Sequence, residues 1–227
     1  MTDQRPLLTF DCYGTLIDWE AGILAGMREA YGEATEAADE DLFSDFLAAQ
    51  DNLKTGSYRT YRQLLAEVAA SVAAARGWAR RAGAAELVPA SVPGWTPFPD
   101  TCEALAQLQE GGFALGILSN IDNDLLAGTL EHFPVRFDLL GTAQNLRSYK
   151  PGRAHFDLGR SWSAGRERWL HVAQSLFHDI IPATKLGLAS VWINRKHEPL
   201  PPEARPERTF PNLASAADWL TGRPAAG

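Results

Sequence analysis

Short apolar runs alternate with longer amphipathic segments over most of this chain. The runs that predict strands are residues 6–10, 113–118, 137–142, 169–173 and 189–193. The segments with helical spacing are residues 100–110, 123–131, 156–162, 177–186 and 213–220. Strands separated by helices are typical of a parallel sheet covered on both faces. The pattern therefore predicts an α/β fold with a doubly wound parallel sheet.

Residues 19–95 break this alternation, because they contain no convincing strand. They are rich in Ala, Glu and Leu, and Leu42, Phe46 and Ala49 repeat at helical spacing. We interpret them as a helical domain inserted after the first strand, with residues 1–18 and 96–227 forming a Rossmann-like core. Asp100 follows the insertion, and we expect it to cap the next helix.

Charge and composition narrow the classes of function. The chain has 28 acidic and 21 basic residues, a formal net charge of −7, so we expect no nucleic-acid partner. No apolar run approaches the roughly 20 residues that span a bilayer, and the first residues lack the pattern of a secretion signal. Cys12 and Cys102 suit neither a metal site nor a disulfide scaffold. We therefore expect a reduced, cytoplasmic protein without a membrane partner.

Polar residues follow four of the predicted strands, at 11–15, 119–122, 148–151 and 174–179. Ligands of open parallel sheets bind beyond the carboxyl ends of the strands, so a site is expected there. Taken singly, each residue has a plain structural interpretation. Asp11 suits a turn cap, Lys150 a surface position before a proline, and Asp179 an exposed helix face.

Together, in this order, the four segments resemble the sequence motifs of the haloacid dehalogenase superfamily. The matching stretches are FDCYGTL at 10–16, ILSN at 117–120, SYKP at 148–151 and HVAQSLFHDIIPATKLGL at 171–188. The helical insertion resembles the cap domain that many members carry after the first motif. The resemblance covers nearly the whole chain and implies a Rossmann-like core with a cap.

The resemblance implies that Asp11 is a nucleophile that forms an ester with the substrate. Lys150 would keep Asp11 ionised, because a nearby cation favours the charged form. Asp179 would orient Lys150 or the water that hydrolyses the ester. Thr15 and Ser119 would position the substrate.

The first and fourth motifs distinguish two chemistries within the superfamily. Members that are phosphatases have a second aspartate where this chain has Tyr13, and a further acidic residue where it has Gln174. Fewer carboxylates mean less affinity for a hard dication, so we expect no cofactor, and magnesium only under the phosphatase alternative. Tyr13 instead resembles the metal-free L-2-haloacid dehalogenases. That resemblance makes Tyr13, Ser119, Asn120 and Ser175 the expected substrate-binding residues.

The chain also departs from those dehalogenases. They use a cap-domain arginine against the departing halide, and no arginine lies between Arg28 and Arg59. Arg59 and Arg62 are candidates for that role, although the interpretation as solvated helix residues is favoured. Three further positions hold residues that differ from the family's: Gln174, Leu176 and Phe156.

Of the five histidines, His178 is the one that the sequence places beside the expected site. The spacing of the others excludes a shared metal and favours core or surface roles: His132, His155, His171 and His197.

The first hypothesis is therefore metal-independent hydrolysis of a small 2-haloacid through an ester on Asp11. A magnesium-dependent phosphatase of the same fold is the alternative within the superfamily. A catalytically idle scaffold that binds a small acid or a partner protein is the alternative of another class. The expected partner is a small carboxylate, and a homodimer is compatible with the resemblance. The halogen, the natural substrate and the oligomeric state stay open.

Overall fold

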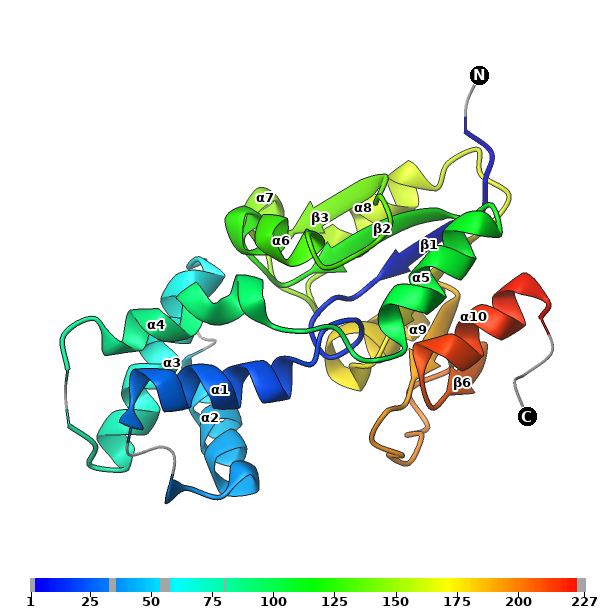
Figure 1. Ribbon diagram of the computed structural model, residues 1–227. Helices are drawn as coiled ribbons and strands as arrows, with labels where there is room; N and C mark the ends of the chain where they lie inside the picture. The colour runs from blue at the N-terminus through cyan, green and yellow to red at the C-terminus, as the bar shows by residue number, and fades with distance from the viewer. Residues whose placement is uncertain (1–2, 33–35, 54–57, 80, 224–227) are drawn as a thin grey trace. The chain divides into compact units, whose positions relative to one another are not determined.

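The computed structural model describes residues 3–32, 36–53, 58–79 and 81–223 (Figure 1). The chain divides into two compact units. The first consists of Met1–Ile17, Pro97–Asn120 and Glu131–Gly227, and the second of Asp18–Thr96 and Ile121–Leu130. The helical segment that follows the second strand thus belongs to the second unit, together with all of the insertion, residues 19–95.

A parallel sheet of six strands forms the centre of the first unit. The strands are β1 (Leu7–Phe10), β2 (Ala114–Ser119), β3 (Leu139–Thr142), β4 (Trp169–Ala173), β5 (Ser190–Ile193) and β6 (Arg208–Phe210). Their order is β3-β2-β1-β4-β5-β6, so the prediction of a doubly wound parallel sheet is confirmed. The order reverses between β1 and β4, and such a switch point is where open α/β sheets bind ligands.

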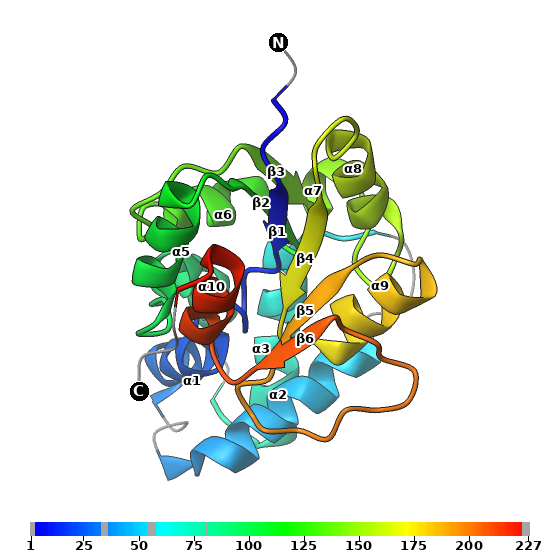
Figure 2. The ribbon, with the colours of Figure 1, turned by 90° about the vertical axis from the view of Figure 1, so that its right-hand side faces the viewer.

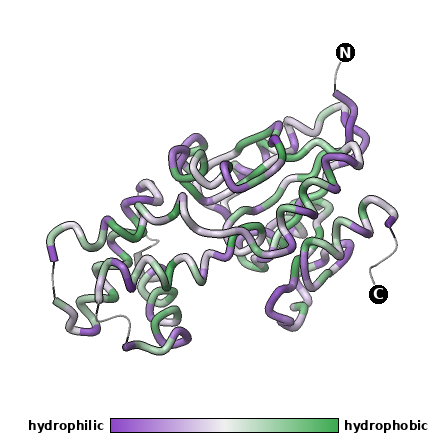
Figure 3. Tube along the Cα trace, in the orientation of Figure 1, coloured by the Kyte–Doolittle hydropathy of each residue, from purple (hydrophilic) through white to green (hydrophobic). Residues whose placement is uncertain are grey.

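Helices cover both faces of this sheet. They are α5 (Thr101–Glu110), α7 (Ala143–Leu146), α8 (Ala154–Trp162), α9 (Ile181–Lys185) and α10 (Leu213–Thr221). Figure 2 shows α5 and α10 on one face and α8 and α9 on the other. Every residue of β1, β2 and β5 is buried, and the strands are largely green in Figure 3. Burial on both faces explains why the strands are continuous apolar runs in the sequence.

Three features of the first unit differ from the predicted elements. β3 begins at Leu139, two residues later than the predicted strand. The short helix α7 and the edge strand β6 were not predicted. β6 has three residues, two of them exposed, so it has no apolar run to reveal it, and the four residues of α7 are too few to display a helical period.

The segment predicted as one helix at 177–186 is a π-helical turn, η3 (Leu176–Ile180), followed by α9. Asp179 N and Ile180 N both donate to Ser175 O, at 3.2 and 3.1 Å. The wider turn leaves Phe177 62% exposed while Asp179 is fully buried. π-helical turns are frequent at functional sites, and this one directs a carboxylate into the protein.

The prediction that Asp100 caps α5 is wrong. Asp100 precedes α5, but its backbone is helical (φ −84°, ψ −12°) and its side chain makes no cap hydrogen bond there, whereas N-cap residues are typically extended. The carboxylate instead accepts hydrogen bonds from Arg195 and, at 2.6 Å, from Leu213 N at the start of α10.

The second unit is helical in its described residues, as the pattern of residues 19–95 predicted. Its elements are α1 (Trp19–Ala30), α2 (Asp39–Leu53), α3 (Tyr61–Ala75), α4 (Ala84–Ser91), the 3-10 turn η2 (Val92–Gly94) and α6 (Asn123–Leu130). Asp122, just before α6, accepts hydrogen bonds from Tyr61 N and Arg62 N at the start of α3. In neither unit does a described helix have the length and hydropathy needed to cross a membrane.

Candidate active site

The loop after β1 begins at Asp11, on the sheet's switch point. Asp11 N donates to Val172 O of β4 at 3.1 Å, which fixes the loop against the neighbouring strand. Gly14 has a φ of 96°, a conformation that glycine adopts without strain and other residues rarely do. The resulting tight turn brings Thr15 back to the Asp11 side chain.

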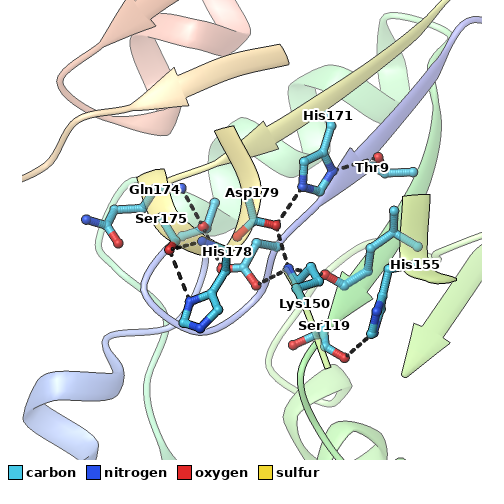
Figure 4. A network of polar contacts seen from close by, with 12 residues as sticks. Thr9, Ser119, Lys150, His155, His171, Gln174, Ser175, His178 and Asp179 are labelled. Carbon is cyan, nitrogen blue, oxygen red and sulfur yellow. Dashed lines mark hydrogen bonds and ion pairs between the residues drawn. The ribbon is translucent and has the colours of Figure 1, made fainter. Parts of the chain in front are cut away.

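Lys150 joins the ends of three strands through its ammonium group. Nζ donates to Asp11 Oδ1 at 2.8 Å, to Asp179 Oδ1 at 2.6 Å and to Leu118 O at 2.7 Å. An ammonium has three hydrogens, so these contacts use all of them. The sequence-predicted catalytic residues Asp11, Lys150 and Asp179 are thus brought together, and Figure 4 shows Lys150 reaching Asp179 in this network.

Burial distinguishes the two carboxylates of this cluster. The side chain of Asp179 is 0% exposed and that of Lys150 is 1% exposed, whereas the side chain of Asp11 is 11% exposed. Within the first unit, solvent therefore reaches Asp11 and does not reach Asp179.

The same burial governs the protonation of the cluster. Burial raises the pKa of Asp11; the Lys150 charge lowers it and the Asp179 charge raises it again, so the pKa lies above its usual range. Burial also raises the pKa of Asp179, but Lys150 and the hydrogen bond from His171 outweigh it and hold this pKa below its usual range. Burial lowers the pKa of Lys150, yet the two carboxylates raise it above its ordinary value. Asp11 is therefore the more basic carboxylate.

Thr15 holds Asp11 from the other side. Its hydroxyl donates to Asp11 Oδ2 at 3.0 Å and accepts from Gln174 N at 2.9 Å. A hydroxyl has one hydrogen, and in this arrangement it points at Asp11. Thr15 thus orients the carboxylate.

Three of the expected substrate-binding residues make specific contacts within the protein. The Asn120 amide accepts from Lys150 N at 2.6 Å and donates to Lys150 O at 3.0 Å. Ser119 is buried and its carbonyl contacts His155 Nε2. The Ser175 hydroxyl accepts from His178 N at 3.1 Å at the start of η3. Asn120 therefore secures the backbone of Lys150, and a substrate contact by any of the three stays a prediction.

Tyr13 and Gln174 occupy the two positions at which, by the resemblance, a phosphatase would have a further acidic residue. Tyr13 is half-buried in the loop after Asp11, and Gln174 is half-buried at the end of β4. Gln174 O accepts from Trp192 Nε1 at 2.8 Å, so the backbone of this residue joins β4 to β5. Among the described residues, no group of three or more His, Cys, Asp or Glu is placed to hold a metal ion.

The expectation that His178 alone among the histidines adjoins the site is wrong. His171 Nε2 lies 2.9 Å from Asp179 Oδ1, and His155 Nε2 lies 3.1 Å from Ser119 O. Both rings are buried and appear beside Lys150 and Asp179 in Figure 4. A histidine inside the apolar run WLHVA of β4 was the available signal for His171.

Arg195, which follows β5, was also missed by sequence reasoning. Its Nη2 donates to Thr15 O at 2.9 Å, and its guanidinium pairs with Asp100 and lies 3.9 Å from the centre of the Phe98 ring. A polar residue just after a parallel strand was the signal here, as it was for the four predicted segments.

The two arginines considered for halide binding both lie in the second unit. Arg59 pairs with Glu67, and Arg62 pairs with Asp124 at 2.5 Å. Their side chains are 29% and 44% exposed. Each guanidinium therefore has a carboxylate partner in its own unit.

Comparison with known proteins places this chain in a family. A sequence model of the haloacid dehalogenase-like hydrolases matches residues 6–158, more than half of the chain. The chain belongs to the haloacid dehalogenase-like hydrolase family.

The similarity extends to individual members. An (S)-2-haloacid dehalogenase of Pseudomonas putida is 27% identical over 129 residues, 55% of this chain and 56% of that protein, so the match spans about half the length of that relative. (S)-2-haloacid dehalogenase 4A of Burkholderia cepacia is 25% identical over 239 residues, 97% of this chain and 94% of that protein. A solved dehalogenase structure superposes with a TM-score of 0.81 at 22% identity, covering 97% of this chain and 99% of that one, and shows a shared fold.

Proposed function

We propose that this chain hydrolyses a small 2-halocarboxylic acid through an ester on Asp11, without a metal ion. The observation that supports it most is the cluster at the switch point, where the accessible Asp11 is held by Lys150 and Thr15 while Asp179 is fully buried. A carboxylate is a weak nucleophile unless it is oriented and partly stripped of water. Asp11 meets both conditions.

In the first step, an Asp11 oxygen attacks the carbon that bears the halogen. The new carbon–oxygen bond forms as the carbon–halogen bond breaks, and the halide leaves with the bonding electron pair. Thr15 and Lys150 each hold one oxygen of Asp11, so the carboxylate enters this step in a fixed orientation.

In the second step, water cleaves the ester, releases the 2-hydroxy acid and a proton, and restores Asp11. Lys150 is placed to stabilise the returning negative charge. We assign to Asp179 the role of holding Lys150, because its Oδ1 contacts Nζ at 2.6 Å and its side chain is 0% exposed to solvent. Tyr13 would line the side of the reacting carbon, where a displacement at carbon tolerates an aromatic wall.

Metal independence is supported by the donor set around Asp11. Tyr13 and Gln174 supply no carboxylate, and the two carboxylates of the cluster both contact Lys150. Hard dications prefer several oxygen ligands, which this arrangement directs at an ammonium instead. We also propose that the second unit acts as the cap that selects the substrate. The cytoplasmic location and the homodimer stay predictions.

Mass spectrometry tests the proposal directly. The protein is incubated with 2-chloro and 2-bromo acids, quenched with acid and digested, and the expected result is a mass adduct on the Asp11 peptide. The exposed Asp157, which pairs with Arg153, offers a control: Asp157→Asn should still form the adduct and Asp11→Asn should not. An adduct elsewhere, or halide release without one, would contradict an Asp11 ester.

Assays with EDTA separate the alternatives. Halide release that EDTA leaves unchanged is the expected result. Release of phosphate from phosphate esters, lost in EDTA and restored by magnesium, would favour the phosphatase. If neither product forms but small acids raise the melting temperature, the chain is a binding scaffold.

A further inference from the structure

A chain of hydrogen bonds runs behind the candidate site, from β4 and β1 to Lys150. His171 is fully buried. Its Nδ1 lies 2.9 Å from Thr9 Oγ1, and its Nε2 lies 2.9 Å from Asp179 Oδ1. Thr9 Oγ1 also accepts from Trp169 Nε1 at 2.8 Å. Figure 4 shows His171 between Thr9 and Asp179.

The chemistry of these groups sets the direction of each hydrogen bond. An indole N–H can only donate, so Thr9 Oγ1 accepts from Trp169, and its own hydrogen can then be donated to His171 Nδ1. The Asp179 carboxylate, whose pKa is held low, is ionised and has no hydrogen to donate, so the ring nitrogen that faces it carries one. His171 Nε2 therefore donates to Asp179 Oδ1.

Asp179 depends on this contact more than an ordinary carboxylate would. Its Oδ1 contacts both Lys150 and His171, whereas its Oδ2 is buried and has no hydrogen-bond partner in the part of the chain that the structure describes. Buried polar atoms normally have partners. Among the described residues, the hydrogen bonds that compensate the burial of this carboxylate therefore fall on Oδ1.

We propose that His171 is a positioning residue that holds Asp179, and through Asp179 holds the Lys150 ammonium against Asp11. Lys150 Nζ has all three of its hydrogens committed, so the loss of one anchor frees the group to move. The inference deepens the proposed function and rests on it for its kinetic test. Its structural test does not need a substrate.

The titratable groups that act on His171 are Asp179 of η3 and His155 of α8. Lys150, in the loop before α8, contacts Asp179, and Asp11, in the loop after β1, contacts Lys150. The ring of Phe156 meets that of His171 edge-on, with centroids 5.5 Å apart. Because the two carboxylates share one ammonium, they titrate as a pair. Removing a donor from one of them raises the pH at which the pair takes up a proton.

Two substitutions separate the donor from the ring. His171→Phe keeps an aromatic ring and removes the N–H, whereas His171→Gln keeps a side-chain N–H that can reach Asp179. We expect His171→Phe to lower kcat about 10- to 100-fold, as for a hydrogen bond to a buried charge, with KM changed much less. The acid limb of the kcat/KM profile should move to higher pH, and His171→Gln should restore most of the rate. The exposed His197, with a φ of 53°, supplies a control: His197→Asn should behave as wild type.

A titration of the substrate-free protein makes the test independent of the reaction. In protein labelled with ¹³C at aspartate carboxyl groups, the Asp179 signal is identified by its loss in Asp179→Asn. We expect this signal to move at a higher pH in His171→Phe than in wild type, and at close to the wild-type pH in His171→Gln. If wild type releases no halide, the proposed function fails while the titration still decides the role of His171.

Two results would overturn the inference. One is a folded His171→Phe protein with wild-type titration and an unchanged pH profile. The other is His171→Gln with a shift as large as that of His171→Phe. If His171→Phe does not fold, Thr9→Val removes the hydroxyl that orients the ring, and the same shift in the Asp179 titration is expected at smaller size. An unshifted titration in Thr9→Val would then count against the inference.

Discussion

Two clusters of cation and carboxylate contact the loop after β1, one at Asp11 and the other at Thr15, and they differ in burial. Lys150 lies between two carboxylates, with side-chain exposures of 1% for the lysine, 11% for Asp11 and 0% for Asp179. Arg195 pairs with the single carboxylate of Asp100, and these side chains are 13% and 17% exposed. The Lys150 cluster is buried and carries a net negative charge, whereas the Arg195 pair is neutral and partly solvated.

The difference shows that burial and charge balance give the two clusters different roles at the same loop. In the Lys150 cluster, two buried carboxylates share one cation, and the pKa of Asp11 is raised while that of Asp179 is lowered. Perturbed pKa values of this kind are typical of reactive groups. In the Arg195 pair, the planar guanidinium meets Asp100 with two nitrogens and reserves one hydrogen bond for Thr15 O, which favours fixed geometry. One cluster sets the ionisation state of Asp11, the proposed nucleophile, and the other holds the backbone of the loop that carries it.

The largest expected effect comes from removing the nucleophile. Asp11→Asn should abolish halide release, because an amide does not attack carbon, while Lys150 keeps Asp179 as its partner and the fold survives. Halide assays with a thermal unfolding curve measure both results. If Asp11→Asn keeps more than a few per cent of the wild-type rate, with deamidation excluded, Asp11 is not the nucleophile.

Loss of the cation should come next. Lys150→Met leaves two buried carboxylates without their cation, a cost of about 3–5 kcal/mol, which protonation of Asp11 relieves at the expense of its nucleophilicity. We expect the chemical step to slow by several orders of magnitude in single-turnover assays, and the acid limb of residual activity to move to higher pH. Lys150→Arg should rescue poorly, because a planar fork does not replace a compact ammonium.

The exposed Lys185 gives the matched control, and Lys185→Met should leave both the rate and the pH profile unchanged. A near-normal rate in Lys150→Met would show that the buried cluster is structural, and the contrast with the Arg195 pair would disappear.

Arg195→Met should have a smaller effect on rate and a clear effect on stability. It removes the hydrogen bond to Thr15 O and leaves the carboxylate of Asp100 without its cation. We expect roughly 2–4 kcal/mol of lost stability in urea unfolding, with roughly a tenfold fall in kcat from the loosened loop. A greater loss of rate than in Lys150→Met would reverse the division of roles between the two clusters.

His155 offers the smallest effect, visible only in acid. Burial, with the Lys150 charge, lowers the pKa of His155 to about 4, whereas the unfolded chain has a value near 6.5. Between these values the unfolded state binds the extra proton, so stability falls as the pH falls from 6.5 towards 4. The difference amounts to at most about 3 kcal/mol.

His155→Gln keeps a donor for Ser119 O and removes the titration. Urea unfolding at several pH values should therefore show a shallower decline for the variant between pH 6.5 and 4, with equal stability near pH 7. Parallel curves for the two proteins would indicate that the buried cluster does not influence its neighbours in this way.

The sequence by itself determined the parts of this protein whose signals are local. Continuous apolar runs such as LLTF and ALGILS reveal strands buried on both faces. The polar segments that follow such runs contain Asp11, Lys150 and Asp179. The order of the motifs also identified the family. These signals lie within a few neighbouring residues, so they can be read from one chain.

Only the tertiary structure decided which residues complete the site. His171 meets Thr9 across adjacent strands, and Arg195 reaches Thr15 from another strand end; these partners lie more than 150 positions apart in the chain. In the π-helical turn that buries Asp179, Ser175 O accepts hydrogen bonds from Asp179 N and Ile180 N. The spacing of apolar residues in the sequence does not distinguish such a turn from an α-helix. Contacts of this kind depend on strand order and register, because pairing of the strands brings distant residues together. A local sequence pattern specifies neither the order of the strands nor their register.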